Sequence, residues 1–171
     1  MSDAFRSEIL GTAGLTFAAC AALLLTLFRR PVVLRADEQR RATALFVGTV
    51  ACQALHFSEE YATHFHQQFP NLFGLSAWSA GFFLAFNLGW LAIWTAVALG
   101  LRAGHRSAFF PAWFLAIASI ANGIAHPLLA VRVGRYFPGL LTAPLVGIAG
   151  GFLWARLMAI THPSPATRLF P

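Results

Sequence analysis

The segment LHFSEEY, at 55–61, places a histidine and two adjacent glutamates in an otherwise apolar stretch. His56 and Glu60 are four positions apart, so in a helix they lie on one face, with Glu59 beside them. Imidazole nitrogens and carboxylate oxygens bind divalent metal ions, and the same groups act as general acids and bases. An ionised carboxylate at the bilayer centre costs about 2.5 kcal/mol or more, so these glutamates need a partner, a proton or water. A functional site is the favoured interpretation.

Two structural interpretations of the same residues remain open. The histidine and the glutamates can form a buried hydrogen-bond network whose role is to join helices. Glu59, which is off the line joining His56 to Glu60, can instead reach toward the lipid headgroups.

Asn122 and His126 form a second polar pair at helical spacing, within the apolar run AFFPAWFLAIASIANGIAHPLLAV. Pro127 follows at once, and its ring is incompatible with the usual hydrogen bond to the carbonyl of Gly123, so a kink is expected. If the helices that carry these residues begin at 42 and 108, His56 and Asn122 both lie about 21 Å along their helices. We expect the two polar faces to meet at this depth, nearer the outer surface of the membrane.

A third group follows in VRVGRYFPGLLTAP. The pair Pro138 and Gly139 predicts a tight turn at the outer interface, with Thr142 at the start of the next helix. Tyr136 would then lie over the polar site, where it either takes part in the chemistry or anchors the chain in the interface.

These pieces together resemble the signature of the HXXEE family of small integral membrane proteins. HFSEE at 56–60 has the HxxEE form, and Asn122-x-x-x-His126 and Tyr136-x-Pro138-Gly139-x-x-Thr142 follow in order. The resemblance covers roughly 45–160 and shows no departure from the pattern. It implies a membrane enzyme without an established reaction, whose polar motif residues form the active site: His56, Glu59, Glu60, Asn122, His126 and Tyr136.

The elements that must position these residues are membrane helices. Of the 171 residues, 58% are hydrophobic and only 11% are charged, far below the usual quarter for soluble domains. The charge is concentrated between apolar runs of about 20 residues, the length that spans a bilayer. We therefore expect an all-α, polytopic helical bundle that forms a single domain over 1–171. Its five spanning helices are expected at 9–28, 42–62, 77–101, 108–131 and 140–160.

The arginines predict the orientation of the bundle. The connection RRPVVLRADEQRR holds five of the twelve basic residues, whereas THFHQQFPNLFGLS holds none. By the positive-inside rule the first connection is cytoplasmic, the N-terminus outside and the C-terminus inside, in a bacterial inner membrane. Because the arginines flank apolar runs, the net charge of +6 reflects topology and not nucleic-acid binding.

Three further features bear on packing. Gly147 and Gly151, in GIAGG, allow helices to approach closely. Trp90 and Trp94 are too central for interface anchors, so they line a pocket or pack in the core. The tail THPSPATRLFP is expected to be frayed.

Two chemistries and one non-enzymatic role fit this pattern. His56, Glu60 and His126 can hold a divalent ion such as Zn, Fe or Mn, which would serve a hydrolase or an oxidoreductase. Alternatively, a buried glutamate beside a histidine can transfer protons without a metal, as in an isomerase or a hydrolase. The competing class is a ligand-binding or assembly subunit of a membrane complex. For an enzyme we expect a lipophilic small-molecule substrate, because the predicted cavity lies below the membrane interface. The sequence leaves the protein partners unknown.

Overall fold

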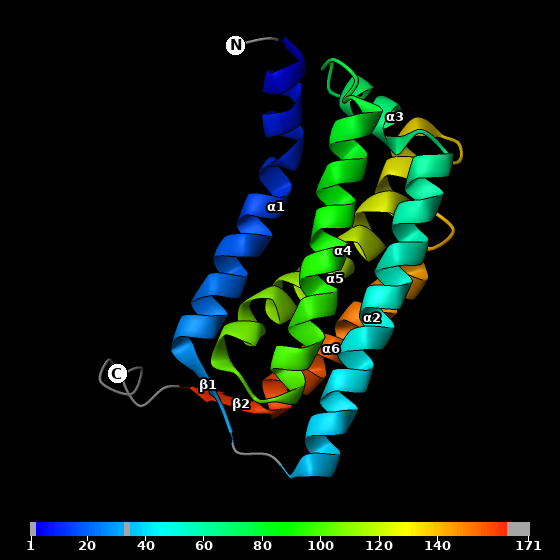
Figure 1. Cartoon of the computed structure of the whole chain (residues 1–171). Coiled ribbons are helices and arrows are strands. Elements are labelled where there is room, and N and C mark those ends of the chain that lie inside the picture. Colours follow the sequence, from blue (N-terminus) through cyan, green and yellow to red (C-terminus); the bar gives the residue numbers. More distant parts are fainter. Residues whose placement is uncertain (1–2, 33–34, 164–171) are drawn as a thin grey trace, which may run out of the picture.

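The computed structural model describes residues 3–32 and 35–163, and these form an all-α bundle (Figure 1). Its helices in chain order are α1 (Asp3–Phe28), α2 (Ala36–Ala62), α3 (Phe65–Asn71), α4 (Ala80–Arg102), α5 (Phe109–Val133) and α6 (Ala143–Ala159). A short 3-10 turn, η1 (Arg106–Ala108), precedes α5. Two three-residue strands, β1 (Arg29–Pro31) and β2 (Thr161–Pro163), form an antiparallel pair. The predicted all-α class is confirmed.

The long helices identify a membrane protein. Within the described residues, three segments are long and apolar enough to cross a membrane: Phe5–Phe28, Ala80–Arg102 and Arg106–Val133. α6 is also apolar but has only 17 residues. α2 begins with a charged turn that contains Asp37 and Glu38 and becomes apolar farther along. Each of the five expected helices exists; the ends at 28 and 62 coincide with those expected, and the other ends are displaced by one to six residues.

α5 and α6 pack closely against each other. A Cβ atom added to Gly123 would lie 2.6 Å from the Cα atom of Gly147, so the two backbones nearly touch. A Cβ atom at Gly150 would lie 2.6 Å from the Cβ atom of Ser119. The expectation for Gly147 is therefore confirmed, whereas that for Gly151 is wrong, since an added Cβ there meets nothing within 4 Å. The contact face of α6 follows from the rotation of the helix, which places Gly150 inward.

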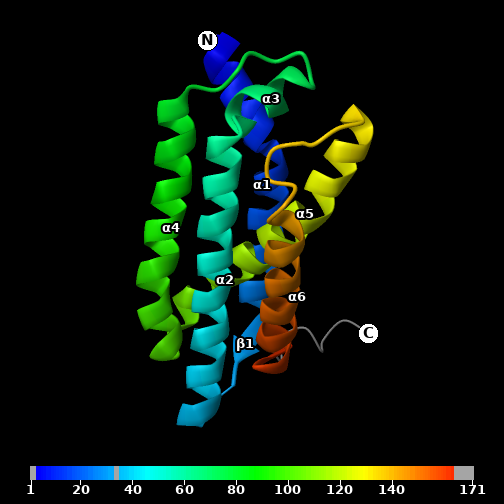
Figure 2. The same ribbon diagram turned by 90° about the vertical axis from the view of Figure 1, so that its right-hand side faces the viewer.

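α2 lies between α4 and α6, while α1 packs mainly against α5 (Figure 2). The apolar core lies toward the end of the bundle that carries β1 and β2, where Phe46, Trp113 and Leu115 are fully buried. The polar residues singled out in the sequence lie toward the opposite end, which carries α3. The bundle thus divides into an apolar half and a half that contains the site.

α3 occupies a segment that was expected to be a plain connection. It has only seven residues and contains Pro70, so no long apolar period announces it. Phe65 and Phe69 stack one turn apart, with ring centroids 4.9 Å apart. They pack with Trp78, whose indole N–H donates to the carbonyl of Ser7 at 3.1 Å and ties α1 to this end.

The expectation of a frayed tail is wrong for Thr161–Pro163, which pairs with β1. Arg29 donates to the hydroxyl of Thr161 at 2.9 Å and to its carbonyl at 2.7 Å. These bonds between residues 132 positions apart require the folded chain, and local composition does not reveal them. The remainder of the predicted frayed tail, 164–171, lies outside the described residues.

Candidate metal centre

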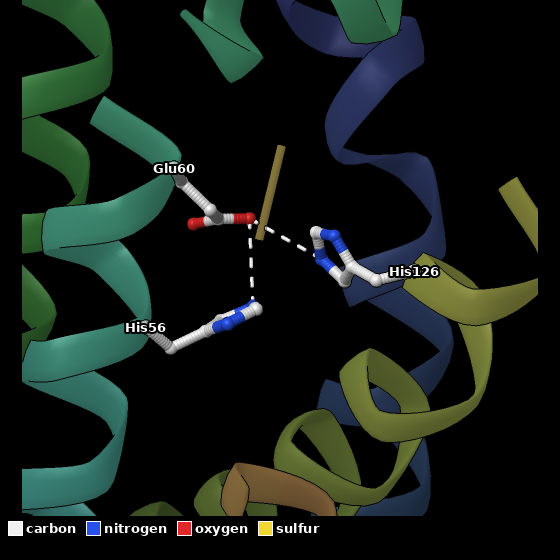
Figure 3. Close-up of side chains that lie close together, drawn as sticks. All are labelled: His56, Glu60 and His126. Carbon is white, nitrogen blue, oxygen red and sulfur yellow. Dashed lines mark ion pairs between the residues drawn. The ribbon is translucent and has the colours of Figure 1, made fainter. Parts of the chain in front are cut away.

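His56, Glu60 and His126 meet inside the bundle (Figure 3). The Nε2 atom of His56 lies 3.6 Å from Oε1 of Glu60, one turn farther along α2. The Nε2 atom of His126, on α5, lies 3.4 Å from the same oxygen. The residues are 0%, 6% and 2% exposed, respectively. We call these three residues the His–Glu–His cluster.

The position of a proton on His126 follows from its other ring nitrogen. Nδ1 lies 2.6 Å from the carbonyl oxygen of Pro138, and a carbonyl can only accept a hydrogen bond. Nδ1 therefore carries the proton and donates it. In the neutral ring, Nε2 then has a free electron pair that faces Glu60.

The same reasoning applies to His56. Its Nδ1 lies 2.8 Å from Oγ1 of Thr142, and the Thr142 hydroxyl donates its own proton to Glu59. Oγ1 of Thr142 is thus the acceptor for His56, whose Nδ1 carries the proton. Nε2 of His56 is buried and has no hydrogen-bond partner among the residues that the structure describes.

With both rings neutral, the cluster therefore presents three electron-pair donors, the two Nε2 atoms and Oε1 of Glu60. The two imidazole nitrogens and the Glu60 oxygen all lie within 4.8 Å of one another. A tetrahedral ion with bonds of about 2.05 Å separates its ligand atoms by about 3.3 Å, close to the 3.4 and 3.6 Å seen here. Metal-binding histidines commonly donate their second nitrogen to a carbonyl or another acceptor, as both do here. The cluster could hold a metal ion.

Glu59 serves a different set of partners. Its carboxylate accepts hydrogen bonds from the Tyr136 hydroxyl at 2.5 Å, the Leu141 amide at 3.0 Å and the Thr142 amide at 2.8 Å, as well as from the Thr142 hydroxyl. This carboxylate therefore holds the loop between α5 and α6 against α2. Burial, followed by the hydrogen bond to Glu59, raises the pKa of the Tyr136 phenol above its ordinary value, so this group stays protonated and donates.

Gly139 allows that loop to approach both histidines. Its φ of 85° lies in the left-handed region that favours glycine. An added Cβ atom would lie 2.5 Å from Cε1 of His126 and 2.9 Å from Cε1 of His56. The predicted turn at Pro138 and Gly139 thus supplies a hydrogen-bond acceptor for one ring and clearance for both.

A cavity of about 270 Å³ begins at the cluster. Glu60 and His126 line it, together with the amides of Gln53, Asn87 and Asn122. The rest of its wall is mainly aromatic and small apolar side chains from α1, α3, α4 and α5. Such a lining suits an apolar molecule that carries few polar groups.

The structure brings the predicted residues together in two groups. His56, Glu60 and His126 form the cluster, and Glu59 and Tyr136 lie beside it around Thr142. The His56 ring meets His126 edge to face, with centroids 4.6 Å apart, one turn beyond Asn122 on α5. His126, and not Asn122, is therefore the residue of α5 that contacts His56, one turn beyond the expected match. α5 continues through Pro127 to Val133.

Asn122 lines the cavity without a hydrogen bond to another described residue. Trp90 and Trp94 line it too, and Trp94 also donates to the carbonyl of Pro111 at 3.1 Å. The sequence reasoning missed the aromatic wall that Phe65 and Phe69 add from α3. Their spacing of four residues was a usable signal for a helical turn.

Comparison with known proteins shows that these residues lie in a segment that matches a family model. A family model described as a protein of unknown function with an HXXEE motif matches residues 44–153, which is more than half of the chain. The matched segment contains the whole His–Glu–His cluster and the loop that supports it. No curated protein and no solved structure matches the chain significantly.

Proposed function

The chain belongs to the HXXEE family, and we propose that it is an integral membrane enzyme that acts on a lipophilic substrate with a divalent metal ion held by His56, Glu60 and His126. The observation that carries this proposal is the orientation of the two histidines. Both donate through Nδ1 to acceptors of the protein, so both direct the Nε2 electron pair at Oε1 of Glu60.

A metal ion explains this arrangement better than a directly shared proton. Hydrogen bonds between N and O normally span about 2.7 to 3.2 Å, shorter than both separations in the cluster. All three electron-pair donors are almost completely buried, and a divalent ion would neutralise the charge of an ionised Glu60 there. Two histidines and a glutamate are a ligand set of catalytic zinc sites, and Fe or Mn accepts the same donors.

Three protein ligands leave a position free for water or substrate. Because Glu60 and His126 line the cavity, that position would face its interior. A metal at this place would supply an activated water for hydrolysis or, in the case of iron, a site for oxygen chemistry. Hydrolase and oxidoreductase are the classes that this site favours; its ligands bind and orient, and the cavity wall excludes bulk water.

Five spanning helices, α1, α2, α4, α5 and α6, complete the proposal, with the N-terminus outside and the C-terminus inside a bacterial inner membrane. The arginines of the first connection support this orientation. Glu60 lies two residues before the end of α2, so in this orientation the cluster lies in the outer half of the bilayer. A substrate that reaches it from the membrane would be lipophilic.

The experiment is turnover of a membrane lipid extract by the purified, metal-loaded protein, followed by mass spectrometry. Products formed by the wild type and by His105→Asn, a change at the opposite end of the bundle, but not by Glu60→Gln, would support the proposal. Equal turnover by Glu60→Gln, or no product from metal-loaded wild type, would contradict it.

A further inference from the structure

We infer that the cavity beside the cluster is a channel for one lipid chain, whose polar head lies at Glu60 and His126 and whose tail runs along α5 toward Trp94 and Phe114. The nature of the head-binding end rests on the proposed function. The number of hydrocarbon chains, the direction of the tail and the route of entry go beyond that function and rest on the shape of the cavity.

The cluster lies near one end of this channel. Along α5, the lining residues run from Phe114 to Leu129, and His126 lies three positions before Leu129. At 1.5 Å per residue, the channel extends about 18 Å from His126 in one direction and about 4.5 Å in the other. An extended chain advances about 1.2 Å per bond, so the longer arm accommodates about fifteen bonds. The tail must therefore point toward the half of the bundle that contains the apolar core.

The channel is narrow. Its volume is about 270 Å³ for the centres of water-sized molecules. Spread over about 22 Å of helix, this volume corresponds to a width of about 7 Å once the radius of a water molecule is added. Carbon atoms pack about 4 Å apart, so one hydrocarbon chain fits, whereas two side by side need about 8 Å. On this average width we expect one hydrocarbon chain in the channel, and not two side by side.

The wall changes character along this length. Near the cluster it carries the amides of Asn122 and Asn87, and farther along it carries Trp90, Trp94 and Phe114. Trp90 and Phe114 pack against each other in this part of the wall, with ring centroids 4.5 Å apart and ring planes tilted by 39°. A molecule with one polar end and one apolar end matches this order of side chains.

The opening lies between α1 and α4. Both helices line the channel, and small side chains of α5, including Ala121 and Ala125, form its floor while remaining exposed. Part of α5 lies between α1 and α4 in the view of Figure 1, and the exposure of Ala121 and Ala125 indicates that side chains do not fully cover this part of the wall. A lipid can therefore enter sideways from the bilayer, without passing through water.

Photolabelling tests this inference. The probe is palmitic acid that carries a diazirine near its methyl end, with a two-chain phosphatidylcholine carrying the same group as the comparison. We expect the palmitic acid to label the peptides that contain Trp94 and Phe114, and the phosphatidylcholine to label only the outer faces of the helices. Labelling of both peptides by both probes, or uniform labelling of the helices, would overturn the inference.

Variants locate the label inside the channel. Ala121→Phe narrows the floor, and since overpacking costs about 1 to 3 kcal/mol, labelling at Trp94 and Phe114 should fall about fivefold or more. Ala96→Phe, on the exposed side of α4 and outside the channel, is the matched control and should label like the wild type. If Ala121→Phe does not fold, Gly14→Leu narrows the channel from α1, where an added Cβ meets nothing within 4 Å. Undiminished labelling in the folded narrowing variant would refute the channel.

Metal content of the same samples separates this inference from the proposed function. Bound metal without labelling of the channel peptides would overturn the channel and leave the proposed function in place. Specific labelling of channel peptides in a protein that binds no metal would remove the metal proposal and leave the channel.

Discussion

The carbonyl oxygen of Pro138 accepts a hydrogen bond from Nδ1 of His126 at 2.6 Å, so the loop between α5 and α6 determines which nitrogen of His126 faces Glu60. The loop does the same for His56 through Thr142. The HxxEE segment on α2 therefore depends on a segment about 80 residues later in the chain. This dependence leads to the following predictions.

Gly139→Ala should lose both metal and stability. The new methyl group would lie 2.5 Å from the His126 ring in a backbone with a φ of 85°, which combines a clash with strain. We expect a loss of about 2 kcal/mol or more of stability. Gly134→Ala is the matched control, because Gly134 has a φ of 67° and open space around it. Thermal unfolding in detergent should show a smaller loss of stability in Gly134→Ala, which suffers only the backbone strain, and its metal content should be unchanged. Equal losses of stability and metal in both variants would count against the contact of Gly139 with the histidines.

Thr142→Val tests the support of His56. Valine has the shape of threonine but cannot accept the proton of Nδ1, so the ring is free to turn its Nε2 away from Glu60. Loss of such a supporting partner lowers metal affinity by about 10-fold to 100-fold. Titration with a competing chelator measures this change. Thr95→Val removes a hydroxyl that donates only to the Leu91 carbonyl on α4, and it should bind metal like the wild type. An unchanged affinity in Thr142→Val would refute the assigned hydrogen bond.

Much of this site follows from spacing alone. His56 and Glu60 share a helix face by their separation of four, and the depth of the apolar runs places His126 within a turn of them. The hydrogen bonds that Glu59 accepts cannot be predicted from spacing. Their donors lie in a loop about 80 residues away, and their geometry depends on tertiary packing. α3 has only seven residues, so the spacing of Phe65 and Phe69 is its one helical signal, and β2 forms only by pairing with β1.

Adjacent glutamates should behave differently when each is changed to glutamine. Glu59→Gln weakens the hydrogen bonds from Tyr136 and Thr142 and should cost about 1.5 to 3 kcal/mol of stability, while the metal ligands remain. Glu60→Gln should remove the metal at little cost in the stability of the metal-free protein. Unfolding of the metal-free variants, together with their metal uptake, distinguishes the two roles. The opposite pattern would mean that Glu59 is the metal ligand and that Glu60 stabilises the fold.

Tyr136 should ionise at higher pH than free tyrosine, whose pKa is about 10. Burial and the bond to Glu59 favour the protonated phenol, so the pKa is raised in the folded state. The stabilisation is complete below the pKa of the unfolded chain and is lost as the pH rises through the folded pKa. The chain has two tyrosines, so ultraviolet titration of Tyr61→Phe reports on Tyr136 alone. Ionisation at or below pH 10 would disprove the assignment.

The central claim is that His56, Glu60 and His126 hold a metal ion, and elemental mass spectrometry of the purified protein tests it most directly. The protein is purified in mild detergent without chelators and reloaded with Zn, Fe or Mn. We predict about one ion per chain in the wild type and in His105→Asn, and almost none in Glu60→Gln and His126→Ala. Absence of metal from the folded, reloaded wild type, or equal metal in all four proteins, would contradict the claim.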